Sequence, residues 1–108
     1  MILLACPFLN GPVRLSAERE AHVQCHHDEF GPALHDILRE LLADPDEIRW
    51  SASDPSMLLF WRWYAALLGG KYAVVAVVLD TTGHDQPWII TAYVARRLRA
   101  GAIAWHRS

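Results

Sequence analysis

The spacing of hydrophobic positions along the chain changes near residue 45. Over residues 32–44 these positions recur every three or four residues, which is the period of a helix with one buried face. The positions are Leu34, Ile37, Leu38, Leu41 and Leu42. A further helix is expected before it, from the N-cap Ser16 toward Phe30, because an acidic first turn follows the serine and Gly31-Pro32 interrupts the pattern. The first half of the chain is therefore predicted to form two helices.

After residue 45 the pattern alternates between hydrophobic and less hydrophobic positions with the period of a strand. Four strands are predicted, over residues 47–51, 57–65, 71–79 and 88–95, with hairpin loops at 69–70 and 82–87. The apolar segment 1–9 is predicted to add an edge strand. We therefore expect a single α+β domain over residues 1–108, with the two N-terminal helices packed on one face of a four- to five-stranded antiparallel sheet.

Length and composition are those of one globular domain. The chain has 108 residues, of which 53% are hydrophobic, so a second domain would not fit, and its apolar runs are shorter than a membrane span. The N-terminal segment lacks the basic region and cleavage site of a signal peptide, which favours a cytoplasmic location. Cys6 and Cys25 have no C-x-x-C spacing and are expected to remain reduced.

Charge is distributed unevenly along the sequence. Residues 1–57 carry four arginines against ten acidic residues, a net −6, whereas residues 58–108 carry six basic residues against two acidic ones, a net +4. The overall charge of −2 argues against general nucleic-acid binding. The basic second half nevertheless offers a local surface for an anion, or a solvated basic segment without a ligand.

Histidines are concentrated in the predicted helices. On the first helix His22 and His26 are four residues apart and share a face. Such a pair can bind a divalent metal, although the third and fourth ligands and a His-Glu-x-x-His pattern are missing. Imidazole can also act as a general acid or base near neutral pH. A solvated or capping role without any chemistry is a third reading of these histidines.

Polar residues within the hydrophobic strands form a second group of candidates. Arg62 lies among aromatic residues, where it needs an acidic partner, solvent or a bound anion. Lys71 opens the next strand, and Thr91 and Tyr93 share one side of the last strand. If these residues and the helix histidines meet in one cleft, the set suits metal-independent cleavage of a phosphate ester. Tryptophan and tyrosine rings could then stack on bases.

Several segments, in this order, resemble one nuclease superfamily. They are Arg14 to His27, Asp44-Pro45-Asp46-Glu47-Ile48, Phe60-Trp61-Arg62, Lys71 to Val75 and Ile89-Ile90-Thr91-Ala92-Tyr93. The order resembles the phage-associated branch of the barnase, EndoU, colicin D and RelE-like (BECR) nucleases, over about residues 14–99. The resemblance implies an α+β fold and a toxin-like, metal-independent ribonuclease without cofactor.

The resemblance gives the expected catalytic positions, and the residue pattern gives the expected substrate-binding ones. His22, His27, Arg62 and Thr91 are expected to be catalytic, with His22 as base or acid. The substrate-binding set is expected to be His26, Lys71, Tyr93 and Arg96. RNA is the expected partner, and a cognate inhibitor protein and a homodimer are further expectations. The alternatives are a non-catalytic interaction module that exposes Trp61, Trp63 and Trp105, and a metal-binding helix built on His22 and His26.

Overall fold

Two α-helices, two short 3-10 helices and a seven-stranded sheet make up the computed structural model, which describes residues 1–79, 86–97 and 101–107. No helix in these residues is both long and apolar enough to cross a membrane. The elements are β1 Ile2–Cys6, η1 Pro7–Leu9, β2 Gly11–Leu15, α1 Ala17–His26, η2 Asp28–Ala33, α2 Leu34–Ala43, β3 Glu47–Trp50, β4 Met57–Tyr64, β5 Lys71–Val78, β6 Trp88–Ala95 and β7 Ile103–His106.

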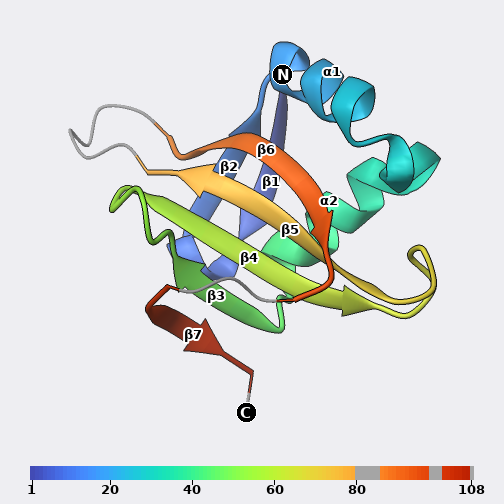
Figure 1. Ribbon diagram of the computed structural model, residues 1–108. Helices are drawn as coiled ribbons and strands as arrows, with labels where there is room; N and C mark the ends of the chain where they lie inside the picture. The colour runs from blue at the N-terminus through green and yellow to red at the C-terminus, as the bar shows by residue number, and fades with distance from the viewer. Residues whose placement is uncertain (80–85, 98–100, 108) are drawn as a thin grey trace.

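The strands follow the order β1-β2-β6-β5-β4-β3-β7, and the sheet curls so that β1 and β2 cross behind the long central strands (Figure 1). All neighbours are antiparallel except β2 and β6, which are parallel and pair through Arg14 and Trp88. Helix α2 packs against β1, β4 and β5, while α1 packs against β6. The curl therefore produces one enclosed face and one face left without a helix across it.

The enclosed face holds the main hydrophobic core. Side chains of β1, β2, α2 and the inward positions of β3–β6 meet there, with Phe60, Leu38 and Val75 fully buried. The opposite face of the central strands carries a smaller cluster of Leu59 and Trp61 from β4 with residues of β5. Successive residues of a strand point to opposite faces, so β4 supplies both clusters alternately.

The predicted sheet of four to five antiparallel strands is wrong in strand number and direction. The ranges predicted for the four central strands differ from β3–β6 by at most one residue at an end, and β1 is the predicted edge strand. No strand was predicted over residues 11–15, where β2 forms, and the position of β2 beside β6 introduces the parallel pair. Strand β7 is too short, at four residues, to show an alternation. The predicted loop 82–87 falls mostly outside the described residues.

Both predicted helices form, but they are shorter than expected. Ser16 caps α1 by accepting a hydrogen bond from the Arg19 backbone N–H at 3.1 Å, as predicted. Helix α1 ends at His26 instead of reaching Phe30, because residues 28–33 form the 3-10 turn η2, which buries Phe30. Gly31 adopts a φ of 56°, a conformation that strains other residues, and α2 begins only at Leu34.

A bulge in β6 changes which residues share a face. Ala76 pairs with Thr91 and its neighbour Val77 pairs with Ile89, so Ile90 is the extra residue. Strict alternation predicts Ile90 on the core side, whereas Ile89 is fully buried there and Ile90 is exposed. The bulge places Ile90 beside Thr91 on the face without helices.

Candidate functional site

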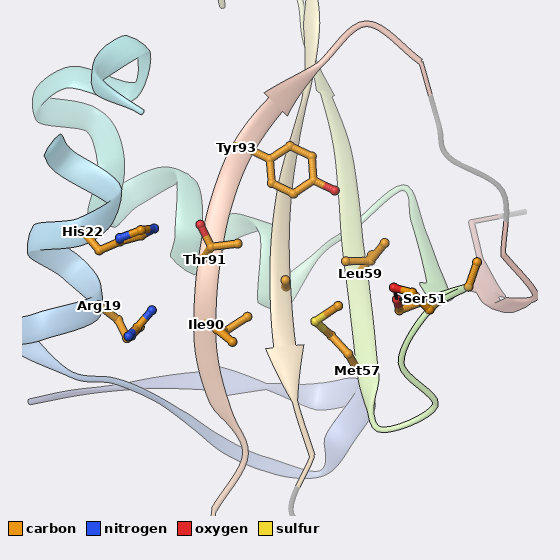
Figure 2. A pocket seen from close by; sticks show the side chains of 11 residues that line it. Arg19, His22, Ser51, Met57, Leu59, Ile90, Thr91 and Tyr93 are labelled. Carbon is orange, nitrogen blue, oxygen red and sulfur yellow. Dashed lines mark hydrogen bonds between the residues drawn. The ribbon is translucent and has the colours of Figure 1, made fainter. Parts of the chain in front are cut away.

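A pocket of about 610 Å³ lies on the face that no helix crosses, between α1, which borders that face at β6, and the β3–β4 loop (Figure 2). Its floor is formed by the central strands, with Met57 and Leu59 from β4 and Ala76 from β5. Ala76 lies between Leu59 and Thr91 in the strand register. Its small side chain leaves the floor hollow at this point.

Helix α1 supplies the charged wall of the pocket. Arg19 and His22 are three residues apart, so both side chains extend from one side of the helix, toward β6 (Figure 2). Arg19 lies in the first turn after the N-cap and has an ion pair with Glu18 at 3.3 Å, and its side chain is 37% exposed. The wall can therefore hold an anion next to an imidazole.

His22 has an environment that disfavours its protonated form. Desolvation is the first cause that lowers its pKa from the ordinary value of 6.5, followed by the positive charges that His26, Arg19 and His27 would carry. The His26 ring stacks on the His22 ring with centroids 4.5 Å apart, and His26 Nδ1 is 3.0 Å from the His22 carbonyl oxygen. These causes favour the neutral form of His22, the form that a general base requires.

Hydroxyl groups surround the rest of the pocket. Thr91 and Tyr93 project from β6, and the Tyr93 ring extends across β5 toward β4 (Figure 2). Ser51 and Ser53 line the pocket from the β3–β4 loop, and their hydroxyl oxygens are 3.2 Å apart. The loop is fixed by Asp54, whose carboxylate accepts hydrogen bonds from Ser56. Because no carboxylate of the described residues lines the pocket, its polar groups suit an anionic ligand.

Arg62 and Lys71 do not join this pocket, contrary to the prediction that they meet the histidines and Thr91 in one cleft. Arg62 is on the enclosed side, where it forms ion pairs with Glu40 at 3.4 Å and Asp44 at 3.2 Å. Burial opposes its charge, but the nearby carboxylates outweigh burial and raise the pKa of Arg62. Lys71 donates to the carbonyl oxygens of Leu68 and Gly70 in its own hairpin, so neither cation faces the pocket.

The remaining predicted residues lie around the pocket rather than in it. His26 contacts the site only through His22. The His27 ring lies 6.4 Å from the Tyr93 ring and 3.7 Å from the Glu29 carboxylate, in a neighbouring hollow. Arg96 is exposed just after the end of β6. Of the eight predicted site residues, the structure brings His22, Thr91 and Tyr93 together in the pocket wall and floor.

The surface predicted for Trp61, Trp63 and Trp105 does not exist as one patch. Trp61 is fully buried in the smaller cluster, whereas Trp63 and Trp105 are 46% and 39% exposed. Trp105 pairs with Ile48 of the main core, and Trp63 contacts Tyr72 on the opposite face. Alternation places Trp61 and Trp63 on the same face, but only the latter reaches the surface.

In the described part of the chain, no third ligand joins His22 and His26 of α1 to complete a metal site. No three His, Cys, Asp or Glu side chains gather there into a group that could hold an ion. Cys6 is buried and Cys25 is exposed, and both are free, as expected. The stacked His22 and His26 rings contact each other instead of converging on a shared centre.

Comparison with known proteins found no relative of this chain. No protein-family model, curated protein or solved structure matches the chain.

Three polar residues of the pocket were not predicted from the sequence. Arg19 precedes His22 by three residues, so the same helical spacing that groups His22 with His26 also indicates Arg19. Ser51 and Ser53 lie in a turn-rich segment, and nothing in the sequence shows that this turn faces α1 across the sheet.

Proposed function

We propose that the chain is a metal-independent ribonuclease whose active site is the pocket between α1 and the β3–β4 loop. The observation that carries the proposal is the meeting of an imidazole of lowered pKa, a guanidinium and several hydroxyls in a pocket that no carboxylate of the described residues lines. These are the groups needed to cleave a phosphodiester by attack of the neighbouring 2′-hydroxyl. The resemblance of the segment order to the BECR nucleases supports the same reaction.

In this reaction His22 takes the proton of the ribose 2′-hydroxyl, and the 2′-oxygen then forms a bond to phosphorus. The bond from phosphorus to the 5′-oxygen breaks, and the leaving oxygen takes a proton from the Tyr93 hydroxyl, a group that carries its proton at neutral pH. The products are a 2′,3′-cyclic phosphate and a free 5′-hydroxyl. His27 lies beside the Tyr93 ring and acts as a positioning residue.

Stabilisation of the developing negative charge is assigned to the remaining pocket groups. Arg19 supplies the positive charge, and Thr91 donates a hydrogen bond from β6. Ser51 and Ser53 face them from the other side of the pocket. A ribonuclease of this kind would damage its host, so we expect a cognate inhibitor protein as a partner.

The test is incubation of the purified chain with total RNA in excess chelator, followed by analysis of the product ends. We expect cleavage with 2′,3′-cyclic phosphate ends, because His22 and Arg19 replace the functions of a metal ion. The control is the same reaction with RNA whose 2′-hydroxyls are methylated, which should remain intact. Cleavage of the methylated RNA, or no cleavage of total RNA by folded protein, would contradict the proposal.

The pH dependence of cleavage follows from the environment of His22. A general base works only when neutral, and the pKa of His22 is lowered from 6.5, so we expect activity to be lost only as the pH falls below 6.5. His26→Gln removes one of the charges that lower this pKa. The fall of kcat/KM on the acid side of the pH profile should therefore move to higher pH. The measurement is kcat/KM against pH for both proteins. An acid-side fall of kcat/KM that moves to lower pH in His26→Gln, or does not move, would contradict this explanation.

A further inference from the structure

Three aromatic side chains continue from the pocket along the same face of the sheet. Tyr93 at the pocket pairs with Val74, and Tyr72 lies two residues before Val74 on β5. Such diagonal neighbours lie about 7–8 Å apart, within reach of aromatic side chains. Tyr72 in turn pairs with Trp63 on β4, with ring centroids 5.1 Å apart. We call Tyr93, Tyr72 and Trp63 the aromatic row.

The outer end of the row is held in place by the β4–β5 hairpin. A Cβ atom added to Gly70 would lie 2.8 Å from the Trp63 ring, so the indole lies directly over the glycine backbone. Tyr72 meets the same ring edge-on at an interplanar angle of 73°. Trp63 nevertheless remains 46% exposed. The indole is thus supported by its neighbours, and nearly half its surface is available for a ligand.

Charges along this face favour an anionic ligand over a cationic or neutral one. Arg19 lies at the pocket end, and the exposed Arg96 and Arg97 follow Ala95, which pairs with Tyr72. Carboxylates near the two ends of the row are paired with cationic or imidazole side chains: Glu47 accepts from Arg49 at 2.8 Å, Asp46 has an ion pair with Arg107 at 3.4 Å, and Glu18 has one with Arg19 at 3.3 Å. Aromatic rings between cations bind unpaired nucleic-acid strands, because each base can stack on a ring while the phosphates meet the cations.

We propose that the aromatic row binds single-stranded RNA beyond the cleavage pocket and stacks on its unpaired bases. This inference rests on the proposed ribonuclease function, and gives that enzyme a preference for single strands over duplexes. Paired bases are stacked on one another inside a duplex and cannot cover the Trp63 ring. Trp63 does not line the pocket and lies beyond Tyr93 and Tyr72 in the row, so substrates long enough to reach it should gain affinity.

The experiment measures binding separately from cleavage. Fluorescein-labelled 2′-O-methyl RNA of eight nucleotides cannot be cleaved by 2′-oxygen attack, and its anisotropy reports binding. We expect Trp63→Ala to weaken binding of the single strand by about tenfold or more, the effect of losing one base–aromatic stack. Trp63→Phe keeps a ring and should retain most of the affinity. The matched control is Trp105→Ala, which removes a comparably exposed tryptophan from the other face and should change binding less than about twofold.

Each result separates this inference from the ribonuclease proposal. Equal binding by the Trp63→Ala and Trp105→Ala variants, or equal affinity for single strand and duplex, would overturn the aromatic row as a base-stacking surface even if total RNA is cleaved. Binding that depends on Trp63 without any cleavage of total RNA would support the row and contradict the nuclease. Absence of binding together with self-association that Trp63→Ala abolishes would reassign the row to contacts with a second copy.

Discussion

His22→Ala is expected to lower kcat for RNA cleavage by about two to four orders of magnitude, the contribution typical of a general base. The effect is large because, among the residues that the structure describes, His22 supplies the one imidazole that lines the pocket. His26 lies behind the His22 ring, and His27 lies in the neighbouring hollow beyond Tyr93. The measurement is single-turnover cleavage of a labelled RNA by wild type and variant.

The matched control for this variant is His106→Ala, because His106 is an exposed histidine of β7 that does not line the pocket. It should retain cleavage within about twofold. His22 is only partly buried, so both variants should keep the thermal unfolding temperature of the wild type. Cleavage by His22→Ala at the rate of the control would exclude His22 as the base.

Local patterns predict the central part of this fold well because each pattern acts within one element. The alternation over β4, β5 and β6 and the helical spacing of α2 depend on neighbouring residues alone. The position of β2 beside β6 depends on contacts between residues more than 70 positions apart, such as the Arg14 backbone N–H donating to the Pro87 carbonyl. No periodicity in Gly11–Leu15 contains that information, so the parallel pair and the curl were not predicted.

The site shows the same division between local and distant information. Thr91 and Tyr93 were placed together correctly because they alternate on one strand, and His22 was selected by its helical spacing. Arg62 was misplaced because its residue type fits two environments equally, a phosphate or the acidic end of a helix. The sequence does not show that Glu40 and Asp44 of α2 and its C-terminal cap lie beside β4.

Substitution of Arg19 and substitution of Arg62 are therefore expected to have opposite effects on cleavage and on stability. Arg19→Ala should lower kcat/KM for RNA by about two to three orders of magnitude, because it removes the pocket cation that faces the phosphate, while the free energy of unfolding stays nearly unchanged. Arg62→Ala should keep cleavage within about twofold but lower the free energy of unfolding by about 1 kcal/mol, since it removes the contacts to Glu40 and Asp44. Urea unfolding and steady-state cleavage, measured on both variants, test the pair. Loss of cleavage in Arg62→Ala with normal stability, and retained cleavage in Arg19→Ala, would move the phosphate site to the enclosed side of the sheet and contradict the pocket assignment.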